Sequence, residues 1–189
     1  SLIVPRAPIP RPLSTQYSWN ACTLLTRTLT ASKNFVLTHV VPISTRMFAF
    51  AIRDPTVGIN VDNESYLDGK EVLTWSLQRG SEVLPLPAYD VKFKHFNVDR
   101  ALSDFNKAVG ATLLNGKSGR DIVSYCEEPI FVVPSTNEEA STNVTLRFTT
   151  DSTMAGKELL LFCYHTRVLE LTVTESGVPQ STVTDQLVR

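Results

Sequence analysis

The sequence predicts an all-β protein, an antiparallel β-sandwich of about eight strands with one principal helix and an extended N-terminal arm. Three observations support this class. Short runs of alternating apolar and polar residues recur along the chain, one central stretch has helical spacing instead, and the first residues are rich in proline. With 42% hydrophobic residues among 189, the chain can bury the core of one such domain.

The N-terminal arm is expected to cover residues 1–18. Its prolines, Pro5, Pro8, Pro10 and Pro12, exclude helix and sheet ladder bonds and favour an extended, polyproline-like path. We expect its apolar side chains to dock on the parent domain or on a neighbouring subunit. These side chains are Leu2, Ile3, Val4, Ile9 and Leu13. A disordered tail or a proline-rich peptide ligand is the alternative.

The domain is expected to cover residues 19–175, and the first half of it consists of predicted strands. Alternation predicts strands at 20–29, 35–41, 47–52 and 71–78. The polar stretch 53–70 predicts a long loop. Pro85 and Pro87 exclude a central strand around them, and the alternation restarts at Val91 and Phe93.

The second half begins with the single predicted helix, 98–114. Its residues Val98, Leu102 and Phe105 follow the spacing of one buried stripe. Strands are then predicted at 121–133, 143–150 and 157–174. Across all the predicted strands, the alternation of buried and exposed faces predicts five core aromatics: Phe48, Phe50, Trp75, Phe148 and Phe162.

The stretch 157–174 is predicted to be the closing strand. At about 3.3 Å per residue it would span roughly 60 Å, which is far longer than an ordinary strand. Its apolar residues change phase near Val168 and Leu169, which predicts a bulge or bend at that point. Residues 176–189 are expected to form a C-terminal arm or tail.

No catalytic constellation is visible, so neither an enzyme nor a bound cofactor is expected. The histidines and cysteines lack metal-ligand spacing, and Gly116-Lys117-Ser118 lacks the first glycine of a phosphate-binding loop. A calcium ion could draw together Asp62, Glu64 and Asp68, but these residues lack the EF-hand pattern, and no metal site is predicted. No apolar run approaches the ~20 residues of a membrane span, so no membrane partner is expected.

Charge is distributed unevenly along the chain. The first 53 residues carry +6 and the remainder −7, which together give the net charge of −1. Such asymmetry favours one surface that faces a polyanion, although six scattered cations could also be simply solvated. The residues expected to face nucleic acid through phosphate contacts are Arg6, Arg11, Arg27 and Lys33.

The order of strands, with helix 98–114 between the fifth and sixth, the long loop and the proline-rich arm resemble the jelly-roll coat proteins of small icosahedral RNA viruses, especially those of plants. The resemblance implies a jelly-roll-like sandwich of two four-stranded sheets, with strand 157–174 inside a sheet beside the first strand. The family's N-terminal cluster of arginines and lysines does not occur in this sequence.

The resemblance also implies a capsid function. The chain would self-assemble with copies of itself or related subunits into an icosahedral shell, of T=3 or pseudo-T=3 type, around genomic RNA. It would be found in the virion, and in the host cytoplasm before assembly. The competing class is a β-sandwich binding or adhesion module, which could be secreted, and an enzyme is third.

Overall fold

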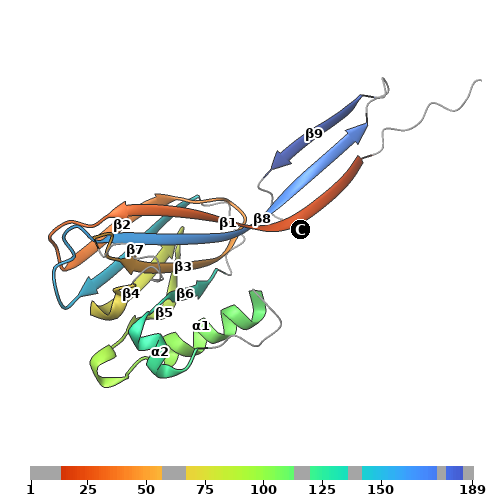
Figure 1. The fold of residues 1–189 in the computed structure, drawn as a ribbon. Helices are drawn as coiled ribbons and strands as arrows, with labels where there is room; N and C mark the ends of the chain where they lie inside the picture. Colours follow the sequence, from red (N-terminus) through yellow and green to blue (C-terminus); the bar gives the residue numbers. More distant parts are fainter. Residues whose placement is uncertain (1–13, 57–66, 113–119, 136–141, 174–177, 185–189) are drawn as a thin grey trace, which may run out of the picture.

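The computed structural model describes residues 14–56, 67–112, 120–135, 142–173 and 178–184, in which two antiparallel sheets stack face to face (Figure 1). The strands are β1 (Ser14–Thr28), β2 (Asn34–Val40), β3 (Thr45–Arg53), β4 (Val72–Arg79), β5 (Glu82–Asp90), β6 (Phe131–Pro134), β7 (Asn143–Thr150), β8 (Glu158–Val173) and β9 (Pro179–Thr184). The helices are α1 (Asp99–Thr112) and α2 (Ile122–Glu127), with 3₁₀ turns at Gly69–Glu71 and Phe93–His95.

The strand order defines the topology. The first sheet has the order β1-β8-β3-β6, with β9 added beside β8, and the second has the order β2-β7-β4-β5. Eight strands that pass between two sheets in this order form a jelly roll, in which the last sandwich strand lies between the first and the third. The predicted all-β, jelly-roll-like sandwich is therefore confirmed.

The core between the sheets is centred on Phe50. Its ring centroid lies 4.7 Å from that of Phe131, 4.9 Å from that of Trp75 and 6.1 Å from that of Phe148. Phe48, Phe50, Trp75 and Phe148 are all at most 2% exposed, as predicted. The fifth predicted core residue, Phe162, is half-buried and packs against the edge of the core.

Arg79 is a charged side chain enclosed completely between the sheets, at 0% exposure. It ends β4, and its guanidinium donates hydrogen bonds to the backbone carbonyls of Thr45 and Ile43, both at 2.6 Å, and to Ser135 Oγ at 3.0 Å. Burial lowers the pKa of the guanidinium, while the Glu82 carboxylate opposes this shift. Arg79 thus ties the end of β4 to the β2–β3 connection and to the end of β6.

Both helices lie in the connection between β5 and β6. The predicted helix 98–114 is observed as α1, which packs against β6 at one end of the sandwich (Figure 1). The hydroxyl of Tyr89 on β5 donates a hydrogen bond to the Asp104 carboxylate of α1. The ring centroid of Phe105 on α1 lies 5.6 Å from that of Tyr125 on α2. These contacts hold the helices on the sheet edge.

Two strand predictions in this region are wrong. Residues 121–133 were expected to form one strand, but they form α2 followed by β6, because Asp121 caps a helix by accepting the Ser124 N–H at 2.9 Å. No strand restarts at Val91 and Phe93. The strand here is β5, which includes Pro85 and Pro87 and occupies the outer position of its sheet, where a missing N–H costs little.

Of the bulge or bend expected in the closing strand, the bulge is not observed. β8 pairs with β1 from Ser14–Thr172 to Thr28–Glu158 without a register shift, and the one irregularity in its pairing with β3 lies at Thr45 and Met47. The phase change near Val168 marks the point where β8 leaves the sandwich. There β9 replaces β3 as its partner.

Beyond the sandwich, the start of β1, the end of β8 and β9 form a three-stranded ribbon, which we call the outer ribbon (Figure 1). It consists of residues 14–19, 167–173 and 179–184. Residues 14–18 of the expected N-terminal arm and residues 179–184 of the expected tail therefore lie in strands.

The enclosure of Arg79 leads to a stability prediction. Arg79→Ala would remove the hydrogen bonds from Arg79 to the Ile43 and Thr45 carbonyls and would open a cavity, so the free energy of unfolding should fall by about 3 kcal/mol. Arg147→Ala, at an exposed position on β7, is the matched control and should change little. Urea unfolding followed by circular dichroism measures both. Equal effects of the two variants would contradict the role assigned to Arg79.

Candidate functional surfaces

Within the described ranges, no group of three or more His, Cys, Asp or Glu side chains is placed to hold a metal ion. Of the calcium candidates, Asp68 forms an ion pair with Lys157, and both side chains are largely buried. Asp62 and Glu64 lie outside the described residues, as does Gly116-Lys117-Ser118. Asp68 thus has a structural partner that sequence spacing could not reveal.

The histidines and cysteines do not assemble into a reactive site. His39 lies on β2, His95 in a 3₁₀ turn and His165 on β8, where its Nε2 lies 2.9 Å from Thr23 Oγ1. Burial raises the pKa of Cys163 to about 12, so its thiol stays protonated at neutral pH. Partial burial raises the pKa of Cys22 as well, which disfavours the reactive thiolate.

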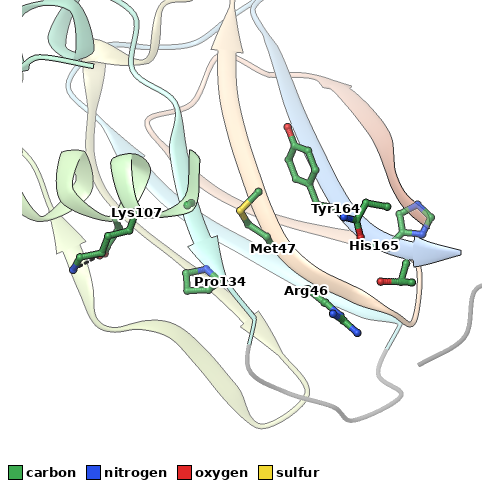
Figure 2. Close-up of a pocket in the computed structure, with 10 residues that line it drawn as sticks. Arg46, Met47, Lys107, Pro134, Tyr164 and His165 are labelled. Atoms are coloured by element: carbon green, nitrogen blue, oxygen red, sulfur yellow. Dashed lines mark ion pairs between the residues drawn. The ribbon is translucent and has the colours of Figure 1, made fainter. Parts of the chain in front are cut away.

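A cavity of about 450 Å³ opens between α1 and the first sheet. Figure 2 shows Met47 and Pro134 between Lys107 of α1 on one side and Tyr164 and His165 of β8 on the other. Arg46 and Lys107 add two cations, and both residues are exposed. An apolar floor with a charged rim suits an apolar side chain from another molecule.

The cations expected to face nucleic acid are only partly described. Arg27 is exposed near the end of β1, and the exposed Lys33 donates from Nζ to the Asp151 carbonyl at 2.6 Å. Arg6 and Arg11 lie outside the described residues, as do the apolar arm residues Leu2, Ile3, Val4, Ile9 and Leu13. The arm joins β1 at Ser14. Since β1 has 15 residues, that junction lies about 45 Å along the strand from Arg27.

The outer ribbon exposes large apolar side chains that sequence reasoning did not single out. Tyr17 is 55% exposed, Val183 56% and Val173 40%. The available signal was the alternation of Tyr17 and Trp19 with polar neighbours, which extends the first strand upstream of Asn20. Exposed apolar side chains that gather on one element indicate an interaction surface.

No protein-family model matches the sequence, and no curated protein matches it. Among solved structures, the mavirus major capsid protein is similar, with 11% identity, 94% of this chain and 42% of that chain covered, and a TM-score of 0.40. PBCV-1 VP54, fitted into a reconstruction of the virophage Sputnik, is 13% identical, and the match covers 90% of this chain and 52% of that chain with a TM-score of 0.46. A structure of the Sputnik virophage is 11% identical, with coverages of 97% and 41% and a TM-score of 0.46.

This chain therefore spans about half the length of the chains that it matches. None of the three likenesses reaches a TM-score of 0.5, so the function is inferred below from the topology and surfaces of this chain. As for membranes, the helices within the described ranges include none long and apolar enough to cross one.

The ion pair of Asp68 and Lys157 leads to a second stability prediction. Asp68→Asn would leave the largely buried Lys157 ammonium without its counter-charge, so the free energy of unfolding should fall by about 2 kcal/mol. Asp151→Asn, which neutralises the exposed ion pair with Lys94, is the control and should leave stability almost unchanged. Thermal and urea unfolding give both values. If both variants lose the same free energy of unfolding, burial does not determine how much the Asp68–Lys157 ion pair contributes to stability.

Proposed function

We propose that this chain is a structural capsid protein that self-assembles into a closed icosahedral shell around a nucleic acid genome. The observation that supports this best is the strand order, β1-β8-β3-β6 against β2-β7-β4-β5, with helices in the β5–β6 connection. This architecture is used by viral coat subunits, and also by lectins and cupins. In the part of the chain that the structure describes, no group of side chains is placed to bind a metal ion as in a cupin.

The surface of the subunit also favours assembly over catalysis. The three cysteine thiols have raised pKa values, and the three histidines lie on separate elements, so none of the cysteines is activated as a nucleophile. Exposed apolar side chains instead gather on the outer ribbon, where they would be covered by neighbouring molecules.

The arm is proposed to run extended over a neighbouring subunit. Its four prolines, Pro5, Pro8, Pro10 and Pro12, reduce the conformational entropy that it loses on docking. Leu2, Ile3, Val4, Ile9 and Leu13 would then stabilise the contact by burial.

The genome is proposed to be RNA, which the cations Arg6, Arg11, Arg27 and Lys33 contact through phosphates. Base-specific contacts are not expected, because no recognition helix or stacking platform was found in the sequence. The acidic later loops would face outward.

A binding or adhesion module is the second candidate. The cavity between α1 and the first sheet favours it, because a hollow of about 450 Å³ with an apolar floor could hold a ligand group. Particle formation distinguishes the two candidate functions, because a capsid protein should form closed shells and a binding or adhesion module should not.

The shell proposal predicts particles that depend on the arm. The purified chain should form closed particles, visible by electron microscopy and light scattering. Deletion of residues 1–13, which end before β1, should weaken or alter the particles while the circular dichroism spectrum stays unchanged. If the full chain stays monomeric at high concentration, alone and with RNA, the capsid proposal fails. Unchanged particles after the deletion would show that the arm is passive.

The genome proposal predicts salt-dependent binding to single-stranded RNA. Replacement of Arg6, Arg11, Arg27 and Lys33 by Gln should reduce the slope of log K against log salt by about 3, because four phosphate contacts are lost. Replacement of Lys92, Lys94, Lys107 and Arg147 by Gln is the charge-matched control. Fluorescence anisotropy with RNA and with DNA of the same sequence measures the slopes. Equal slopes for the two variants would contradict the assignment, and tighter binding to DNA would argue against an RNA genome.

A further inference from the structure

The outer ribbon has two chemically different faces. Its strands pair in register, Tyr17 with Leu169 and Leu169 with Val183, so directly opposed residues share a face. One face carries the apolar residues Tyr17, Trp19, Leu169, Leu171, Val173, Pro179 and Val183, together with Thr15, Ser181 and one cation, Arg167. The opposite face carries Ser14, Gln16, Ser18, Val168, Glu170, Thr172, Gln180, Thr182 and Thr184. The ribbon is therefore mainly apolar on one side and mainly polar on the other.

The apolar face continues the core-facing side of the first sheet. Within the sandwich, Leu25 of β1 pairs with Leu161 of β8, and both pack in the core that faces the second sheet. The ladder keeps its register from there to Ser14, so the side chains two, four and six residues further along stay on that side. The first sheet therefore extends its core-facing side past the end of the second sheet (Figure 1).

Among the residues that the structure describes, none forms a layer over this extension as the second sheet does over the rest of the first sheet. Tyr17, Val173 and Val183 are each at least 40% exposed, whereas Leu161 and Cys163 on the same side of β8 are 0% exposed. A sheet with one apolar face is stable when another layer packs about 10 Å away. What would complete the ribbon is a second sheet of similar width.

The dimensions of the face distinguish between possible occupants. Three strands at about 4.8 Å spacing make it about 14 Å wide, and its six-residue strand β9 makes it about 20 Å long. The N-terminal arm is a single extended chain that would cover about one strand width. Its prolines, such as Pro8 and Pro10, also lack the N–H groups needed to build a sheet.

We infer that the apolar face of the outer ribbon packs against the same face of a second copy of this chain, so that two ribbons form a two-layer sandwich between subunits. The second copy supplies a layer of the required width, length and apolar character. Among the described residues this face carries no acidic side chain, and its one cation, Arg167, lies at the end nearest the sandwich, so two copies can meet over the rest of the face without burying a charge.

The size of the contact predicts its strength. Each face covers about 300 Å², so a pair buries about 600 Å², well below the roughly 1,200–2,000 Å² of a stable complex. The pair should therefore be weak in dilute solution and effective where many copies are held close together. In this respect the inference rests on the proposed shell and names one of its contacts.

Photo-crosslinking tests the occupant directly. In a Cys22→Ser, Cys126→Ser chain, Leu171→Cys is labelled with benzophenone maleimide, and Thr172→Cys, half-buried on the polar face, is the matched control. Irradiation at high protein concentration should give several-fold more covalent dimer from position 171 than from position 172. Mass spectrometry should map the product to residues 14–19, 167–173 or 179–184 of the second copy. Circular dichroism checks that both variants fold alike.

Other outcomes would overturn the inference. Crosslinks from position 171 to residues 1–13 would identify the arm as the occupant, and equal dimer yields from positions 171 and 172 would indicate non-specific association. No crosslinked product, in solution or in particles, would show that the face stays open. Particles without the crosslink would refute the ribbon pair alone, whereas the crosslink without particles would refute the shell alone.

Discussion

The ladder between β1 and β8 joins the first strand of the sandwich to the last and keeps one register from Ser14–Thr172 to Thr28–Glu158. Because β8 also pairs with β3, it completes the first sheet only when the C-terminal part of the chain is present. The ladder brings together residues up to 158 apart, so closure of the sandwich carries the entropic cost of ordering a long loop. The same ladder extends outward as the ribbon, so the core and the exposed surface share one pair of strands.

The two sheets are held in place by different kinds of contact. Phe50 packs against Trp75 of the opposite sheet and against Phe131, its neighbour in the same sheet, and burial of this aromatic area stabilises the middle of the sandwich. Arg79 acts at the end of β4, where a polar side chain can satisfy backbone carbonyls in the connecting loops. Apolar packing fixes the distance between the sheets, and Arg79 fixes the path of the chain between them.

Sequence reasoning predicted the sandwich because most of its strands have one buried face and so alternate with period two, as Phe48, Phe50 and Trp75 show. It missed α2, whose residues Val123 and Tyr125 have high strand propensity and whose start is signalled by one cap, Asp121. The outer ribbon was missed because β9 is short and polar, and its strand character depends on pairing with β8. The partner of Asp68, Lys157, lies 89 residues away and could be found only from the fold.

The outer ribbon also has a mechanical consequence. It is continuous with β1 and β8, so a force applied to it along the strands enters the first sheet through both of them. That force acts perpendicular to the hydrogen bonds between β8 and β3, which are loaded in shear and must fail together instead of peeling one by one. A pull on the ribbon would therefore move the sandwich as a rigid body, and tension between neighbouring molecules would be carried without unravelling either of them.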